Sequence, residues 1–362
     1  MPSRYVILII AVLIVSLGII SIYSSTYQRQ TQVWKQQVFR ALLGIGVFLV
    51  FSYVNYRRLW DIATFFFVVA VILLCFVFVL GVIRLGAQRW LQFVGFNLQP
   101  SEVMKLAVII FLARYFSRRS VSTSSLGSRQ LGIVDGLIIP LAFIAIPMFL
   151  IIEQPDLGSA LMLLFIFLAM LFLTNIRGIY LGIFVGLCAA IAPFFWHFLK
   201  GYQKDRLMVF LNPNIDPLGA GYTLIQSKIA MGSGGLFGKG WLSGTQSQLR
   251  FLPESHTDFI FATFAEEWGF VGGGFVLVLY YLLIRESFRI AARTHDHFGK
   301  LLAFGISLSI SIQAFINIAM TMGLMPIVGL PLPLMSYGGS SIVVTFAALG
   351  ILANIDRTRS IF

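Results

Sequence analysis

Long apolar segments recur along the chain and constrain its fold more than any other feature. Of 362 residues, 58% are hydrophobic and only 11% are charged, whereas about half of a soluble domain is apolar. A helix that crosses the hydrocarbon core needs about 20 predominantly apolar residues. The sequence therefore predicts an all-α polytopic membrane protein with about ten transmembrane helices. It excludes a soluble, collagen-like or disordered chain. The predicted spans are approximately Tyr5–Ile22, Val38–Val54, Ile62–Ile83, Pro100–Phe116, Ile133–Ile152, Leu157–Leu173, Ile179–Leu199, Phe259–Ile284, Leu301–Leu324 and Ser341–Asn354.

Basic side chains gather in alternate short connections between the predicted spans. The chain carries 26 Lys and Arg against 14 Asp and Glu, a net charge of +12. Because Lys and Arg are concentrated in loops that stay in the cytoplasm, the pattern predicts that both termini are cytoplasmic. A soluble protein with this charge would suggest nucleic acid as a partner. Here the membrane orientation accounts for the charge, and we expect no nucleic-acid partner.

One connection is much longer than the others. It runs from about residue 200 to residue 258, between the seventh and eighth predicted spans, on the extracytoplasmic side. Loops of more than about 12–15 residues usually have a function. Within it, Tyr222–Met231 has apolar residues at helical spacing, which predicts an amphipathic helix lying on the membrane surface. Gly232–Gly240 is a glycine-rich turn. We interpret residues 1–362 as a single membrane domain.

Ionisable residues at membrane depth are costly and usually mark a polar cavity or an ion pair. Glu102 and Lys105 lie three residues apart in the fourth span, so they would share one face of a helix. This spacing predicts either a structural ion pair or a charged Lys105 that faces a cavity receiving an anion. Asp156, which follows a proline between two spans, is expected to cap the next helix. At least one of Glu266 and Glu267 is expected to point into a polar interior.

The densest polar cluster, Pro253–Asp258 (PESHTD), directly precedes the eighth span. In one interpretation, Thr257 or Asp258 caps that helix. In the other, Asp258 is held at the outer membrane surface beside a long loop, where its carboxylate accepts a proton from a substrate hydroxyl. His256 with two acids within five residues is a weak metal signal. The sequence contains no zinc motif, nucleophile elbow, P-loop or dinucleotide fingerprint.

A second unusual segment, Gly329–Ser341 (GLPLPLMSYGGSS), lies between the last two spans and carries no charge. Its Pro and Gly content predicts a re-entrant or membrane-hugging segment on the outer side. Such a backbone is tolerated only where protein or water surrounds it. Gln313 and Asn317 in the preceding span are expected to supply hydrogen-bond partners.

Ordered motifs are spread over the whole chain. They are GAQRWL (Gly86–Leu91), QPSEVMKL (Gln99–Leu106), EQPDLGSA (Glu153–Ala160), DPLGAGY (Asp216–Tyr222), QSKIAMGSGGLFGKGW (Gln226–Trp241), TQSQLRFLPESHTDFIFA (Thr245–Ala262), AEEWGFVG (Ala265–Gly272) and PLPLMSYGGSS (Pro331–Ser341). With these motifs the chain resembles the SEDS family of bacterial cell-wall proteins (shape, elongation, division and sporulation). The TQSQLRFLPESHTDF stretch is more similar to the elongation type than to the division type.

The resemblance implies a peptidoglycan glycosyltransferase, a hexosyltransferase that polymerises lipid II at the outer face of the bacterial cytoplasmic membrane during cell elongation. It implies that Asp258, the Asp of the HTDF motif, is the essential catalytic residue. It also implies a partner, a class B penicillin-binding protein that supplies transpeptidation.

The chemistry of lipid II suits these residues. A pyrophosphate joins its disaccharide-pentapeptide to an isoprenoid, so the reaction needs a base for the acceptor hydroxyl and positive charge for the departing diphosphate. An α-linked donor and a β-linked product require one inverting displacement, for which Asp258 is enough as general base. A divalent cation, Mg²⁺ or Mn²⁺, is a further candidate. The candidate substrate-binding residues, which the sequence does not rank, are Lys105, Glu102, Arg206, Lys228, Lys239 and His256.

Three alternatives remain open from the sequence. In the first, Lys228 and Lys239 do not bind substrate and only extend their side chains toward lipid headgroups. The chain is alternatively a lipid II flippase, since many helices with interior charges also describe a transporter. It is alternatively a non-catalytic scaffold of the wall-synthesis complex. Polymer formation from lipid II in detergent distinguishes an enzyme from a flippase, because detergent leaves no two sides to transport between.

Overall fold

The computed structural model describes residues 3–29, 32–84, 87–93, 96–124, 132–174, 178–198, 200–217 and 219–359. Every predicted apolar segment coincides with a helix, because a backbone inside lipid must satisfy its own hydrogen bonds. The long helices are α1 (Ser3–Thr26), α2 (Val33–Tyr53), α3 (Arg58–Leu80), α4 (Pro100–Ser124), η2 (Val134–Ile138) continuing into α5 (Ile139–Glu153), α6 (Leu157–Phe172), α7 (Gly178–Phe198), α11 (Ile260–Arg293), α12 (His297–Thr321) and α13 (Gly339–Arg359).

Among the described residues, 7 helices are long and apolar enough to cross a membrane. They are α1, α2, α3, η2 with α5, α11, α12 and α13. The helix α6 is apolar but shorter, with 16 residues. A polytopic membrane protein is therefore confirmed.

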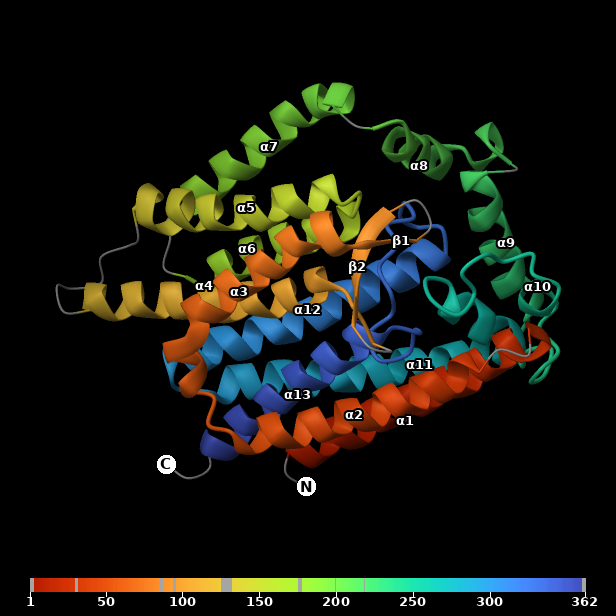
Figure 1. Ribbon diagram of the computed structural model, residues 1–362, viewed down its shortest axis with the longest axis horizontal. Helices are drawn as coiled ribbons and strands as arrows, with labels where there is room; N and C mark the ends of the chain where they lie inside the picture. Colours follow the sequence, from red (N-terminus) through yellow and green to blue (C-terminus); the bar gives the residue numbers. More distant parts are fainter. Residues whose placement is uncertain are drawn as a thin grey trace.

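Apart from α7, the long helices run side by side (Figure 1), and α13 is the most buried of the candidate spans. In the most apolar window of each helix, 83% of residues are buried for α13 but only 28% for α3. The outward faces carry exposed apolar side chains such as Phe65 and Val79, as lipid-facing surfaces do. The start of α1 and the end of α13 lie toward one end of the bundle, and the small helices α8, α9 and α10 lie at the opposite end (Figure 1).

The long loop forms a layer at that opposite end. It contains α8 (Gly201–Leu211), η3 (Pro213–Ile215), α9 (Ala220–Ser233) and α10 (Thr245–Gln248). The predicted helix over Tyr222–Met231 is confirmed, because it falls within α9. Leu224, Ser227 and Ala230, three residues apart, are buried against the bundle, and the Ser227 hydroxyl donates a hydrogen bond to the carbonyl of Thr321 in α12 (2.7 Å).

The glycine-rich turn packs against a break in α11. Gly269 has a φ of 68° and a ψ of −164°, a conformation that is open mainly to glycine. The amide of Lys239 donates to the carbonyl of Glu266 (3.1 Å), and the amide of Phe270 donates to the carbonyl of Gly235 (2.9 Å). These hydrogen bonds across the break anchor the long loop to the helix that follows Asp258.

The chain between α3 and α4 departs from the all-α prediction. It forms a 3-stranded antiparallel sheet of β1 (Val82–Arg84), β2 (Ala87–Phe93) and β3 (Phe96–Leu98). The seven residues AQRWLQF have no helical periodicity, and glycines flank the first two strands; such short pieces favour hairpins over helix. The all-α prediction therefore holds for the spans and is wrong for this connection, which brings Arg89 and Trp90 toward the loop layer.

Candidate active site

A cavity of about 380 Å³ lies at the end of the bundle that carries the loop layer. Its volume is within the range of small-molecule sites. Asp258, His256 and Arg206, three of the residues expected from the sequence, line it. Arg40 from α2 and Arg89 from β2 also line it, so the site is assembled from segments far apart in the sequence.

Asp258 does not cap the helix that follows it. The helix α11 begins at Ile260, and its N-cap residue is Phe259, with no side-chain capping hydrogen bond. The Thr257 hydroxyl instead donates to Oε2 of Glu254 (2.9 Å). The interpretation of Thr257 or Asp258 as the helix cap is therefore wrong, because the N-cap position is taken by Phe259, the residue that follows the polar cluster. The Asp258 carboxylate is left facing the cavity.

The main chain around Asp258 is held from two sides. Nδ2 of Asn317 in α12 donates to the carbonyls of Asp258 (2.9 Å) and Leu330 (2.7 Å). The Ser336 hydroxyl donates to the carbonyl of Thr257 (2.6 Å), and the Tyr337 amide donates to the carbonyl of His256 (3.0 Å). The predicted role of Asn317 as a partner of the 329–341 segment is confirmed, and this network leaves the Asp258 backbone little freedom.

The segment between α12 and α13 is buried in protein, as its composition requires. Leu330, Leu332 and Leu334 are each about 1% exposed. Nε2 of Gln313 donates to the carbonyl of Pro331 (2.8 Å), which confirms the second predicted partner. Non-helical backbone is stable here because side chains of α12 replace the hydrogen bonds that water would provide.

The environment of Asp258 favours its protonated form. The pKa of Asp258 is raised from 3.8 to about 6, with burial as the largest cause and the nearby Glu254 carboxylate as the second, while Arg206 and Arg89 act to lower it. A general base works best when its pKa lies close to the working pH. A carboxyl group with a pKa of about 6 is still ionised at neutral pH and is a stronger base than an ordinary aspartate.

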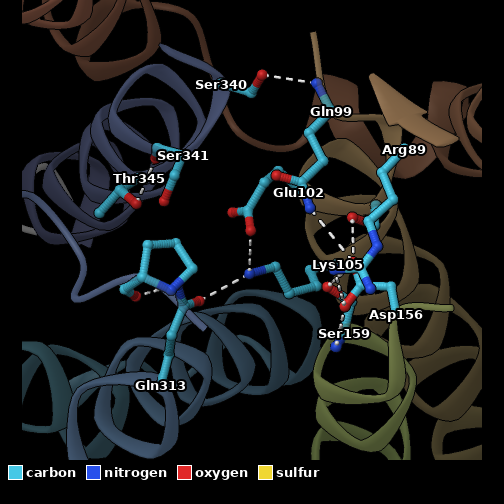
Figure 2. Close-up of polar contacts among 12 residues, drawn as sticks. Arg89, Gln99, Glu102, Lys105, Asp156, Ser159, Gln313, Ser340, Ser341 and Thr345 are labelled. Carbon is cyan, nitrogen blue, oxygen red and sulfur yellow. Dashed lines mark hydrogen bonds and ion pairs between the residues drawn. The ribbon is translucent and has the colours of Figure 1, made fainter. Parts of the chain in front are cut away.

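Three arginines give the cavity a positive lining. Nη1 of Arg206 donates to the carbonyl of Ile327 (3.2 Å). Nε of Arg89 donates to the carbonyl of Gln154 (3.0 Å), and its Nη1 lies 3.9 Å from Asp156 (Figure 2). These carbonyl contacts fix the direction of both guanidinium groups at the cavity, where their remaining N–H groups can donate to an anion.

Arg40 is the least compensated of the three. Its side chain is buried, with 5% of the residue exposed, and its guanidinium carbon lies 4.7 Å from the centre of the Tyr337 ring. Its Nη1 atom has no hydrogen-bond partner among the residues that the structure describes. A buried charge without a partner is costly, so this position indicates a binding role.

The sequence interpretation missed Arg40 and Arg89. Arg40 interrupts the second apolar segment, and an ionisable residue at that depth is a signal that could have identified it. Arg89 lies in a connection rich in polar residues and carries no such signal. Its guanidinium donates to the carbonyls of Gln154 and Pro155 and lies near the Asp156 carboxylate. Asp156 caps α6 as predicted, by accepting a hydrogen bond from the Ser159 amide (3.2 Å).

Glu102 and Lys105 form the predicted ion pair, but they do not line the Asp258 cavity. Nζ of Lys105 lies 2.8 Å from Oε1 of Glu102 and donates to Oε1 of Gln313 (2.7 Å), as Figure 2 shows. Both residues line a separate cavity of about 30 Å³, which has room for only a few water molecules. Through Gln313 the pair links α4 to the 329–341 segment.

We expect Glu102→Gln to lower the free energy of unfolding by about 3–5 kcal/mol, because it leaves the buried Lys105 charge without its partner. Thermal unfolding in detergent measures this effect. The control is Glu153→Gln, which breaks an exposed pair with Lys200 at 3.5 Å and should change stability by less than about 1 kcal/mol. The double change Glu102→Gln with Lys105→Gln should recover part of the loss. Equal effects of Glu102→Gln and the control would contradict the structural role.

The two remaining lysines lie away from the cavity lining. Lys228 is exposed on α9. Lys239 lies 2.7 Å from Oε1 of Glu266. Glu266 and Glu267 are both buried, and the Ser24 hydroxyl donates to Oε1 of Glu267. Both glutamates therefore have polar partners at the junction of α11 with the long loop.

The described residues contain no group of three or more His, Cys, Asp or Glu side chains that could hold a metal ion. Two carboxylates, Glu254 and Asp258, line the cavity. One or two carboxylates completed by substrate phosphates are the usual protein ligands of Mg²⁺. This donor set fits a divalent cation that arrives with a diphosphate.

Comparisons with known proteins identify the relatives of the chain. The family model for the FtsW, RodA and SpoVE group, described as cell cycle protein, matches residues 4–361. The chain is 43% identical to the peptidoglycan glycosyltransferase MrdB of Escherichia coli, covering 90% of this chain and 86% of that one. It is 35% identical to a probable peptidoglycan glycosyltransferase FtsW of a Geobacter species, covering 97% and 96%.

Two solved structures share the fold. One comes from work on the structural coordination of polymerization and crosslinking by a peptidoglycan synthase complex; it superposes with a TM-score of 0.81 at 28% identity and covers 98% of each chain. The other is the rod shape determining protein RodA of Thermus thermophilus, with a TM-score of 0.72 at 27% identity, covering 98% of this chain and 97% of that one.

Proposed function

The chain belongs to the SEDS family of FtsW, RodA and SpoVE proteins and is a peptidoglycan glycosyltransferase of the RodA type, and we propose that it polymerises lipid II in the Asp258 cavity. The observation that carries the proposal is one cavity that combines a carboxyl group with a pKa of about 6 and three arginines. A base and a cluster of cations are what the two halves of the transfer need.

The transfer is a single inverting displacement. The 4-hydroxyl oxygen of the acceptor sugar bonds to the anomeric carbon of the donor as the bond from that carbon to the pyrophosphate oxygen breaks. The hydroxyl proton passes to Asp258, and undecaprenyl pyrophosphate leaves with the bonding electrons. Because the pyrophosphate is already a stable anion, it needs no second carboxyl group as acid, unlike the leaving sugar of a glycoside hydrolase.

Arg40, Arg89 and Arg206 are the residues that we assign to the diphosphate. Guanidinium groups form paired hydrogen bonds with phosphate oxygens, and fixed cations stabilise charge that develops on a leaving group. The main-chain partners of Arg89 and Arg206 support this assignment, because they hold each group in place before substrate arrives. His256, 5.6 Å from the Tyr337 ring, borders the same space and is assigned to contact with the sugar or peptide.

A divalent cation, Mg²⁺ or Mn²⁺, fits the Glu254 carboxylate together with oxygens of the substrate diphosphate, which leaves Asp258 free to act as the base. When bound, it would supply further positive charge to the diphosphate. We assign no direct contact with the diphosphate to Lys105, Lys228 or Lys239, since none of them lines the cavity.

The proposed setting is the bacterial cytoplasmic membrane, with ten crossings, both termini in the cytoplasm and the Asp258 cavity on the outer side. The excess of Arg in alternate connections supports this orientation. The partner that we propose is a class B penicillin-binding protein, a transpeptidase. The likeness to a chain of a synthase complex that coordinates polymerization and crosslinking supports such a partner.

The polymerisation rate is expected to rise with pH to a plateau, with its midpoint near pH 6. Below that pH the Asp258 carboxyl is protonated and accepts no proton, so the rate should fall about tenfold per pH unit in the acid limb. Initial rates with purified protein, partner and lipid II between pH 4.5 and 8.5 measure the midpoint. Glu254→Gln removes a like charge that raises the pKa, so its midpoint should lie lower. A flat profile would contradict the base assignment.

Polymer formation in detergent tests the function itself. We expect glycan chains from lipid II with the purified complex, since a polymerase needs no second compartment. Transport without polymer, measured in vesicles, would instead support a flippase, and full activity of a complex that carries Asp258→Asn would support a scaffold.

A further inference from the structure

A second large cavity lies at the other end of the bundle, away from Asp258. It has a volume of about 490 Å³ and is lined by Thr64 of α3 and by five residues of α4: Phe111, Arg114, Tyr115, Arg118 and Arg119. The end of α4 and the start of α3 lie on the left of Figure 1, on the side opposite α8 and α9. The polymerisation reaction described above makes no use of this cavity.

Its charge is strongly positive. Three guanidinium groups line it, and Arg119 is paired with Asp135 at 3.0 Å. Among the residues that the structure describes, no carboxylate forms an ion pair with Arg114 or Arg118. These two arginines are four residues apart on one helix, an arrangement in which like charges repel. An anion bound between them would relieve that repulsion.

Arg114 is oriented by neutral groups, and Arg119 packs on an aromatic ring in addition to its pairing with Asp135. Nη1 of Arg114 donates to the Thr64 hydroxyl (2.8 Å), and its guanidinium carbon lies 5.9 Å from the centre of the Trp60 ring. The Tyr115 hydroxyl donates to the carbonyl of Asp135 (2.8 Å), and the Arg119 guanidinium lies 5.7 Å from the Tyr115 ring. Hydroxyl and aromatic partners hold a cation without neutralising it, which lowers the entropy lost when an anion binds.

The apolar part of the cavity lining comes from the Phe111 and Tyr115 rings. The Phe111 ring stacks on Phe67 at 4.7 Å and lies 5.2 Å from Phe143, measured between ring centres. Phe143 is exposed, and Ile146, three residues further along α5 and so on the same face of that helix, is exposed as well. A charged rim above an apolar wall matches a molecule with a phosphate at one end and hydrocarbon at the other.

We propose that this cavity binds the phosphate of an anionic phospholipid headgroup, with Arg114 and Arg118 as its ligands and the acyl chains lying along the phenylalanine wall. Guanidinium groups match phosphate oxygens in geometry and charge. In the proposed orientation this end faces the cytoplasmic leaflet, where basic pockets between transmembrane helices hold such headgroups. The inference depends on the membrane arrangement and not on the polymerase activity, so the two can fail separately.

Native mass spectrometry of the delipidated protein, titrated with phosphatidylglycerol or with phosphatidylcholine, tests the proposal. We expect one phosphatidylglycerol to bind at least about tenfold more tightly than phosphatidylcholine. Arg114→Gln with Arg118→Gln should remove that preference, a loss of about tenfold. The matched control is Arg285→Gln with Arg293→Gln, which removes the same charge from exposed positions on α11 and should change affinity less than twofold.

Two further arms distinguish a lipid from free phosphate and from charge alone. Inorganic phosphate at millimolar concentration should not displace the lipid; displacement would overturn the proposal in favour of a free anion. Arg118→Lys should bind several-fold more weakly than the wild type, because an ammonium lacks the planar fork. Equal loss in the control pair, or no preference for phosphatidylglycerol, would also overturn it. Arg118→Gln alone covers the case in which the double variant fails to fold.

Discussion

Replacing Asp258 by Asn should lower the polymerisation rate at least ~100-fold, and up to ~10⁴-fold, because that is what a positioned general base contributes. The amide keeps the size and most of the hydrogen bonding of the carboxylate but has almost no basicity. The assay is glycan formation from lipid II by the purified complex. Asp205→Asn on α8, an exposed position outside the cavity, is the matched control and should keep full activity.

The same variant should be at least as stable as the wild type at pH 7.5. The pKa of Asp258 is raised on folding, so the folded state holds the proton more tightly than the unfolded state. Stability therefore falls as the pH rises from about 4 to about 6, and the full cost of ionisation is present at pH 7.5. Asn removes that cost. The free energy of unfolding should rise by on the order of 1 kcal/mol, because Asp258 is partly exposed and solvent screens its charge. The gain should disappear below about pH 4, where the carboxyl is protonated in both states. Loss of folded protein would point back to a structural role for Asp258.

The second large effect is expected for Arg40→Met, which should lower the polymerisation rate about 100- to 1000-fold without loss of stability. Removing one group that stabilises developing charge typically costs that much. Methionine fills a similar apolar volume, and it removes a buried guanidinium whose Nη1 lacks a partner among the described residues. Replacing buried charge by packed apolar groups is often neutral or stabilising. Polymerisation assays and thermal unfolding of the same preparation measure both effects.

The control for Arg40 is Lys35→Met, which removes one positive charge from an exposed position on the same helix and should leave the rate unchanged. Arg40→Lys should retain part of the activity, since it keeps the charge but loses the paired hydrogen bonds. A Met variant that polymerises normally, or that loses activity only because it unfolds, would remove Arg40 from the diphosphate site.

The sequence was sufficient for features that depend on local composition. Apolar length located the helices, since lipid leaves the backbone no other structure. Helical spacing predicted the Glu102–Lys105 pair, and a proline followed by Asp156 predicted the cap of α6. Each of these involves residues within one turn or one connection, where neighbours in sequence are neighbours in space.

The candidate site was only partly predictable, because long-range contacts build it. Asp258 was identified from a polar cluster and Arg206 as one of several unranked cations, whereas Arg40 and Arg89 reach the cavity through the packing of α2 and of an unpredicted hairpin. The orientation of Asp258 depends on Asn317 and on Ser336, which contacts the neighbouring Thr257 across 79 residues of sequence. Periodicity and motifs carry no information on which side of a bundle such segments meet.

The most direct test of this account is a structure of the complex with a non-reactive lipid II analogue in both donor and acceptor positions. We expect the acceptor 4-hydroxyl within hydrogen-bond reach of Asp258, about 2.6–3.2 Å from its carboxylate, and the donor diphosphate against Arg40, Arg89 and Arg206. A bound analogue whose sugars lie beyond reach of Asp258, with its diphosphate held by other residues, would contradict it.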